Sequence, residues 1–275
     1  MWTMPLLLSA LGCKKVEDVP ADLDGAMHFL WTHLEEGTDE ELVSGVISLD
    51  GALGGATLEE TTDGSISRLT APEVEPLGVT DRDPALAAGI VMGNLITCNV
   101  EMVAEILTWP EQDVLYPGVY QSYDRTYHGD IPTFLDGGVD TLEWSLDYGA
   151  KVISSDYTGH TEALMRRVGA EAFGEEETSI TKAYVVRYFA PDPAVFEEGS
   201  SRTFEQDYQF EVYWNRGSGE TLHAYSMWRQ ANWGVGFTSE DESVQRLLLN
   251  GMADWDKDTD DICAEGGPEA ASAGR

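Results

Sequence analysis

Four carboxylates near the C-terminus have the spacing of a metal site. Asp254, Asp256 and Asp258 occupy alternate positions, and Glu265 stands at the twelfth place counted from Asp254. This spacing nearly matches a calcium loop, in which oxygen ligands at alternate positions converge on one ion. The sixth place, however, holds Thr259, where such a loop needs a glycine for its sharp turn. We therefore expect an acidic helix end with no cofactor, and calcium remains as the weak alternative.

Side chains that could act as nucleophiles, bases or phosphate ligands show no catalytic spacing. The five histidines form no H-E-x-x-H motif. Ser218 lies between two glycines, which fits a hairpin turn better than a nucleophile elbow. Arg125, Arg187 and Arg229 lie in aromatic-rich segments, where each either binds a carboxylate ligand or pairs with one of the many acidic residues. The sequence favours a non-catalytic protein.

The charge balance excludes two classes of partner. The 275 residues include 50 acidic and 16 basic ones, which gives a net charge of −34. Nucleic acids and anionic lipid surfaces both require clustered Lys and Arg, so neither is an expected electrostatic partner. Acid-rich composition instead suits a solvated surface in salty surroundings. The length predicts one large domain, or one domain with an appendage.

The elements that must position any site begin with an N-terminal helical hairpin. Thr38 and Glu41 form a capping-box pattern at the start of the second helix. The rest of the segment up to residue 85 is rich in Gly, Thr and Asp, and we expect irregular structure there. The first helix carries apolar residues at helical spacing: Leu23, Met27, Leu30 and Leu34.

The following segment predicts a strand and then a short helix. Residues 86–98 are apolar, with β-branched side chains in the second half. Asn99 is a good N-cap, and Pro110 ends the helix that it begins.

Beyond residue 140, apolar and polar residues alternate along several segments, as in antiparallel strands. Residues 204–214 and 222–230 form the strongest hairpin pattern, with Phe204, Tyr208, Phe210 and Trp214 expected on one face. A last helix over about 240–258 follows, with Ser239 or Ser243 as its cap.

This order of elements, from Ile90 to Cys263, resembles the START and polyketide-cyclase-like helix-grip superfamily. The segments 103–110 and 115–119 are similar to that family's first helix and the loop after it. The resemblance implies an α+β fold, in which an antiparallel sheet packs on a long C-terminal helix and the N-terminal helical hairpin is an addition.

The resemblance also implies a cavity between sheet and helix that binds an apolar small molecule or lipid. Aromatic side chains on the inward face of the sheet would line it, although the same residues would also suit a filled core. The nominated ligand-binding residues are Tyr123, Trp144, Tyr208, Phe210 and Trp228.

The first residues form an apolar, uncharged run that is too short to span a bilayer. It ends in Gly12 and Cys13, with Ala10 three places before the cysteine. This pattern resembles the lipobox of bacterial lipoproteins, which implies lipidation of Cys13. Because Lys14 follows it, the resemblance implies an outer-membrane anchor facing the periplasm or cell surface. The alternative is a plain apolar segment with a buried cysteine.

Two cysteines remain when Cys13 is set aside. Cys98 and Cys263 form one possible disulfide, which the periplasm and cell surface allow. The alternative is two unrelated buried thiols.

These observations predict a division of the chain into five parts. The parts are a signal peptide at 1–12, a tether at 13–21, the helical hairpin and irregular segment at 22–85, the α+β sheet domain at 86–265 and a disordered tail at 266–275.

The functional expectation is a cell-envelope lipoprotein that binds an apolar small molecule or lipid. It is held at the membrane by its lipid anchor and has no nucleic-acid partner. The alternative is a structural or protein-interaction lipoprotein with a filled core, which docks a partner through an exposed apolar patch near residues 22–49.

Overall fold

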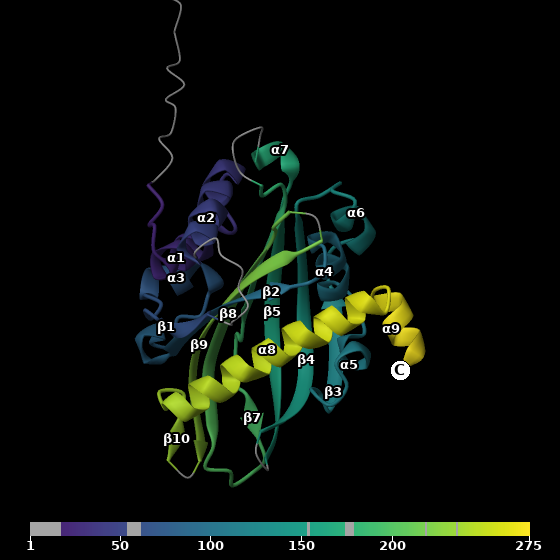
Figure 1. Ribbon diagram of the computed structural model, residues 1–275. Helices are drawn as coiled ribbons and strands as arrows, with labels where there is room; N and C mark the ends of the chain where they lie inside the picture. Colours follow the sequence, from purple (N-terminus) through teal and green to yellow (C-terminus); the bar gives the residue numbers. More distant parts are fainter. Residues whose placement is uncertain (1–17, 54–61, 153–154, 174–178, 218, 235) are drawn as a thin grey trace, which may run out of the picture.

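The computed structural model describes residues 18–53, 62–152, 155–173, 179–217, 219–234 and 236–275 (Figure 1). It is an α+β fold built on one antiparallel sheet, with strand order β1-β2-β9-β8-β6-β5-β4-β3, while β7 pairs with β5 and β10 with β9. The strands are β1 Thr62–Ile66, β2 Ala88–Ile96, β3 Ser122–Tyr127, β4 Thr141–Val152, β5 Ser155–Val168, β6 Ala183–Phe189, β7 Val195–Phe196, β8 Thr203–Asn215, β9 Thr221–Gly234 and β10 Phe237–Thr238.

Helices cover both faces of this sheet. The α-helices are α1 Leu23–His33, α2 Asp39–Ala52, α3 Ala71–Val74, α4 Val100–Leu107, α5 Gln112–Leu115, α6 Ile131–Leu135, α7 Ala170–Phe173, α8 Glu242–Ala264 and α9 Pro268–Gly274, with short 3-10 turns at Glu75–Leu77 and Pro84–Leu86. None of the described helices is long and apolar enough to cross a membrane.

One face of the sheet packs against the hairpin of α1 and α2, and we call it the hairpin face. Its centre is Trp31 of α1, which is 1% exposed. The Trp31 ring makes edge contacts with Tyr208, Phe210 and Trp228 at centroid distances of 6.2, 5.7 and 5.5 Å. Aromatic and aliphatic side chains fill this layer, so it forms the main hydrophobic core.

The other face carries α4 and α8, and we call it the helix face. Figure 1 shows the long α8 crossing the strands. Leu249 of α8 packs on Met92 of β2 and on Tyr225 and Met227 of β9. The short α4 covers a second cluster on the same face, around Trp144.

The predicted helix starts are confirmed for α2 and α4. The Thr38 hydroxyl accepts from the Glu41 amide, and the Glu41 carboxylate accepts from the Thr38 amide. Asn99 accepts from the Met102 amide at 2.7 Å. The start of α8 differs from the prediction, since Asp241, rather than Ser239 or Ser243, is its N-cap residue.

The alternation of β8 is interrupted near its start. The register between β8 and β9 shifts between Phe204 and Gln206, as at a β-bulge. Phe204 therefore packs with Trp233 and with Val244 of α8 on the helix face. The predicted common face for Phe204 and Tyr208 is wrong, because one extra residue reverses the side-chain direction.

The C-terminal tail was predicted to be disordered, and this is wrong. Gly266 and Gly267, with φ of 100° and 102°, turn the chain after α8. Pro268 then begins α9, which buries Ala271 against Ile106, Leu115, Tyr116 and Ile262. The small residues of the tail allow close packing on α5, so burial rather than local composition decides its structure.

Candidate functional site

A cavity of about 310 Å³ lies between the helix face and α8. Met252 and Trp255 of α8 form one wall, and side chains from β3 to β9 form the other. The lining combines apolar groups such as Leu146 with four charged ones, Arg125, Lys151, Glu211 and Arg229. The cavity is therefore polar at several points, unlike the apolar cavity expected from the sequence.

A second hollow of about 330 Å³ adjoins the first under the beginning of α8. The two share Lys151, Tyr157 and Arg229 as lining residues. Apolar side chains dominate the second hollow, and its Phe237 and Leu247 are 44% and 66% exposed. We call the first, more polar hollow the inner chamber and the second, mainly apolar hollow the mouth.

Arg125 of β3 projects into the inner chamber. Its Nη1 donates to the Leu107 carbonyl at 2.8 Å and to the Tyr127 hydroxyl at 2.9 Å. The guanidinium lies over the rings of Tyr127, Tyr123 and Trp144, at 5.7, 5.6 and 5.1 Å from their centroids. These contacts fix the cation by hydrogen bonds and cation–π attraction.

Arg229 and Arg187 behave differently from Arg125. Arg229 binds Asp207 through two hydrogen bonds, of 2.8 and 2.9 Å. Arg187 projects from β6 toward α1 and pairs with Glu35. Both therefore follow the expectation that buried arginines pair with acidic residues.

A buried acid–base cluster connects the cavity wall to α8. His223 of β9 is 0% exposed, and its Nδ1 lies 2.9 Å from an Asp256 oxygen. Its Nε2 lies 3.9 Å from Glu211 and has no hydrogen-bond partner among the described residues. The Tyr213 hydroxyl donates to Glu211, and its ring stacks on His223 with centroids 4.1 Å apart.

Burial and mutual charge shift the pKa values in this cluster. Burial raises the pKa of the Glu211 carboxyl, although nearby His223 acts in the opposite direction. Burial alone would lower the pKa of His223, but Asp256 and Glu211 raise it above the ordinary value. Both shifts favour the protonated forms, so this cluster binds protons more readily than the same groups would in water.

Tyrosine hydroxyls provide further neutral hydrogen-bonding groups in the chamber. Tyr120, Tyr148, Tyr157 and Tyr188 all line it. Burial raises the pKa of Tyr120 to about 12 and raises that of Tyr188 well above its ordinary value. These phenols are neutral at physiological pH, so they can bind ligand oxygens without adding charge.

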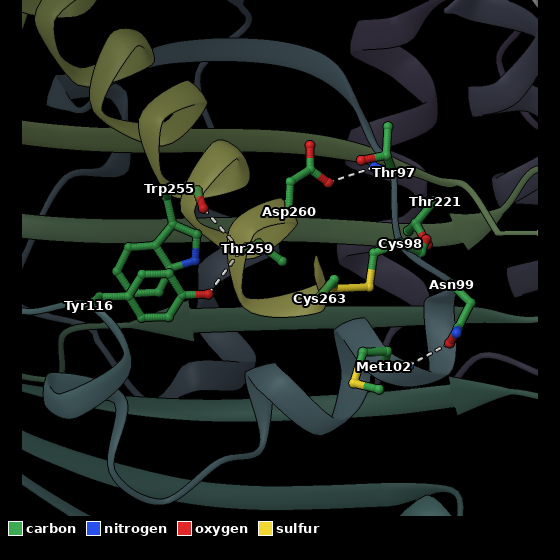
Figure 2. The surroundings of a disulfide bond; sticks show 10 residues. All are labelled: Thr97, Cys98, Asn99, Met102, Tyr116, Thr221, Trp255, Thr259, Asp260 and Cys263. Carbon is green, nitrogen blue, oxygen red and sulfur yellow. Dashed lines mark hydrogen bonds between the residues drawn. A yellow bond between two sulfur atoms is a disulfide. The ribbon is translucent and has the colours of Figure 1, made fainter. Parts of the chain in front are cut away.

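The C-terminal half of α8 is tied to the rest of the molecule by several bonds (Figure 2). Cys263 and Cys98 form a disulfide with an S–S distance of 2.01 Å. Nearby, Asp260 accepts from the Thr97 amide at 2.6 Å. Trp255 stacks on Tyr116 at 3.7 Å, which places a fixed aromatic ring at the cavity wall.

The structure separates the five nominated aromatic residues. Tyr208, Phe210 and Trp228 lie on the hairpin face, within the filled core around Trp31. Tyr123 and Trp144 lie on the helix face, where they flank Arg125 rather than line the chamber. The sequence analysis assigned all five residues to one cavity, because the alternation of apolar and polar residues does not show which face of a strand packs against α8.

The predicted calcium ligands do not form a loop. Asp254, Asp256 and Asp258 lie within the continuous α8, and Glu265 follows as its C-cap. Successive helical positions point in different directions, and Asp256 already binds His223 and Asn94. Among the described residues, no group of three His, Cys, Asp or Glu side chains is placed to hold a metal. Cys13 lies outside the described residues.

Sequence reasoning missed the residues that give the chamber its polarity. Glu211 and His223 lie in strands next to apolar neighbours, and a polar residue at a core-facing strand position is the signal that points to them. The tyrosines come from four separate segments, so only the folded sheet shows that they face one space.

Comparison with known proteins identifies no family for this chain. Neither a protein-family model nor a curated protein sequence matches it. Human STARD10 is similar at a TM-score of 0.38 and 9% identity, covering 62% of this chain and 63% of that protein. The Zhui aromatase/cyclase from Streptomyces sp. R1128 is similar at 0.37 and 9%, covering 68% and 93%.

Dicamba monooxygenase bound to 3,6-dichlorosalicylic acid is similar at 0.38 and 8% identity, covering 66% of this chain. The chain spans half the length of that protein. TM-scores at this level do not indicate a ligand or an activity for this chain.

Proposed function

We propose that the protein binds one small amphiphilic molecule in the chamber under α8. The observation that carries this proposal is a hollow of about 310 Å³ between α8 and the sheet, whose opposite face carries the hydrophobic core around Trp31. Ligand pockets of this size combine apolar walls with a few placed polar groups. The walls from Leu146 and Met252 and the polar groups of Arg125 and Glu211 fit that description.

A cavity-filling variant tests this proposal. Thr161→Trp places an indole in the chamber, while Thr126→Trp adds the same group on an exposed position of the neighbouring sheet edge. Thermal unfolding is measured with and without decanoate, decanol, 4-butylbenzoate and 4-butylbenzyl alcohol. A ligand that binds the native state raises the melting temperature.

We expect at least one of these compounds to stabilise the wild type and Thr126→Trp but not Thr161→Trp. The smaller substitution Ala150→Leu provides a second filling variant if the tryptophan prevents folding. Equal stabilisation of the filled variants and the wild type would contradict the proposal, as would no response to any compound.

We also propose that the protein is a cell-envelope lipoprotein anchored through Cys13. The apolar run before Cys13 and a disulfide suited to an oxidising compartment support this location. Labelled fatty acid should appear on the wild type and not on Cys13→Ser. Equal labelling of the two proteins, or a wild type that takes up no label, would contradict the lipid anchor at Cys13.

A partner-docking role through α1 and α2 is less well supported. It requires an exposed apolar patch near residues 22–49, but Met27, Leu30, Trp31 and Leu42 are buried. Within that range, Ile47 is the large hydrophobic residue described as exposed, at 40%. A lone exposed residue needs no partner to explain it.

A further inference from the structure

Arg125 differs from the other buried arginines of the sheet in having no carboxylate partner within the part of the chain that the structure describes. The sequence contains 50 acidic residues, and Arg187 and Arg229 each pair with one of them. Among the described residues, no carboxylate forms an ion pair with Arg125. A cation withdrawn from water without a counter-charge is costly, so a folded protein usually supplies one.

The guanidinium of Arg125 has one edge occupied and one edge free. Nη1 donates to Leu107 and Tyr127, whereas Nε is buried without a partner and Nη2 makes no described hydrogen bond. The Nε and Nη2 donors form one side of the guanidinium fork. That side matches the two oxygens of a carboxylate, which accept two parallel hydrogen bonds.

We propose that the ligand of the chamber is a carboxylic acid with an apolar body, and that Arg125 binds its carboxylate. This inference rests on the proposed function and adds the chemical class of the ligand. The fixed position of Arg125 over three aromatic rings prepares the cation before the ligand arrives, which reduces the cost of binding.

The other charged groups of the two hollows are consistent with this assignment. Arg229 is neutralised by Asp207, so it offers no net charge. Burial raises the pKa of Glu211 above its ordinary value, so this carboxyl ionises less readily than an exposed one and repels an anion less. Lys151 is exposed at the junction of the hollows and is the competing cation.

The shape of the two hollows indicates where the apolar body lies. The α8 residues that line them run from Ser243 to Trp255, a distance of about 18 Å along a helix. Arg125 lies in the inner hollow with Trp255, while Val244, Leu248 and Phe237 line the apolar mouth. A fatty or alkyl-aromatic acid would place its carboxylate inside and its tail toward the mouth.

The test compares acids with neutral compounds of the same shape. Calorimetric titration is carried out with decanoate, decanol and decanamide, and with 4-butylbenzoate and 4-butylbenzamide. We expect the wild type to bind each acid about tenfold to a hundredfold more tightly than its neutral counterpart. Arg125→Gln should lose this preference, and Arg125→Lys should keep part of it because the charge remains without the fork.

Matched variants make the result specific. Arg246→Gln removes an exposed arginine of α8 and should leave the preference unchanged. Lys151→Gln removes the competing cation at the junction of the hollows and should reduce the preference by less than Arg125→Gln does. Equal binding of acids and neutral compounds by the wild type would overturn this inference but leave the proposed function standing. Loss of the preference in Lys151→Gln rather than Arg125→Gln would also overturn it. Failure of every compound to bind would overturn both proposals.

Discussion

The hairpin face and the helix face of the sheet differ in whether the indole N–H groups of their buried tryptophans have hydrogen-bond partners. On the hairpin face, the indoles of Trp31, Trp214 and Trp228 donate to Glu73, Asp50 and Ser67 at 2.9, 3.0 and 2.7 Å. On the helix face, the buried indole N–H groups of Trp144 and Trp233 have no described partner.

This difference indicates that one face of the sheet stabilises the fold and the other is arranged to bind a ligand. The hairpin face pairs its indole N–H groups and fills its space, as a core selected for stability does, and Arg187 Nε is a buried donor there without a described partner. The helix face leaves buried donors unsatisfied at Arg125 and Trp233, which line the two hollows, and at Trp144 and Tyr123, which flank Arg125. Unpaired buried donors cost stability, and a bound ligand can recover part of that cost.

The largest expected effect is on the hairpin face. Trp31→Ala should lower the free energy of unfolding by about 3–5 kcal/mol, because it removes a fully buried ring from a filled layer. Met252→Ala, which only enlarges the existing chamber, should cost about 1 kcal/mol. Urea unfolding measures both, and equal losses would contradict the distinction between the faces.

The second largest effect on stability is expected from the disulfide that joins Cys263 of α8 to Cys98, just after β2. Cys263→Ser should lower the free energy of unfolding by about 2–5 kcal/mol, because the disulfide closes a loop across 165 positions. The reductant dithiothreitol should destabilise the wild type and leave the variant unchanged. A wild type insensitive to reduction would argue against the bond.

A smaller effect is the pH dependence from His223. Its pKa is raised in the folded state, so the stability it contributes is fully present below its unfolded pKa of about 6.5 and is lost as pH rises through the folded value. Wild type should therefore lose more stability than His223→Gln between pH 6 and 9, measured by urea unfolding.

Other groups contribute to the same pH range, and they remain in both proteins. His28 and His160 also have raised pKa values. Burial lowers the pKa of each, but Glu73 raises that of His28, and Glu162 and Asp147 raise that of His160 by more than burial lowers it. The difference between wild type and His223→Gln isolates the cluster. Parallel stability curves for the two proteins would show that the cluster does not bind a proton on folding.

The smallest effect on stability is expected at the mouth. Leu247→Ser changes a side chain that is 66% exposed, so the free energy of unfolding should change by no more than about 0.5 kcal/mol. Affinity for decanoate should nevertheless fall by more than affinity for hexanoate, because only the longer tail reaches the mouth. Equal losses for the two acids would place the tail elsewhere.

The sequence predicted local structure well where the physical cause is local. The capping box of Thr38 and Glu41 and the N-cap Asn99 depend on neighbours three residues apart, and both form as expected. The β8–β9 hairpin follows from alternation, except at Phe204, where the bulge leaves no clear pattern in composition.

The site was harder to predict because it depends on packing between distant elements. Alternation places Tyr208 and Trp228 on one face but does not show that α1 covers it. The pairing of Arg229 and the isolation of Arg125 depend on which acids the sheet brings near each arginine. The sequence predicted the last helix only as far as about residue 258, whereas α8 continues to Ala264. Its buried Asp256 is held by His223, a contact between distant segments that the sequence alone does not reveal.

The most direct test of a ligand chamber on the helix face is a crystal structure with 10-bromodecanoate. Anomalous scattering from bromine marks the tail of the acid independently of the interpretation of the remaining density. The account predicts a bromine between the sheet and α8, near Phe237 and Val244, with the carboxylate at Arg125. Bromine located only on the outer surface or beside α1 and α2 would contradict it.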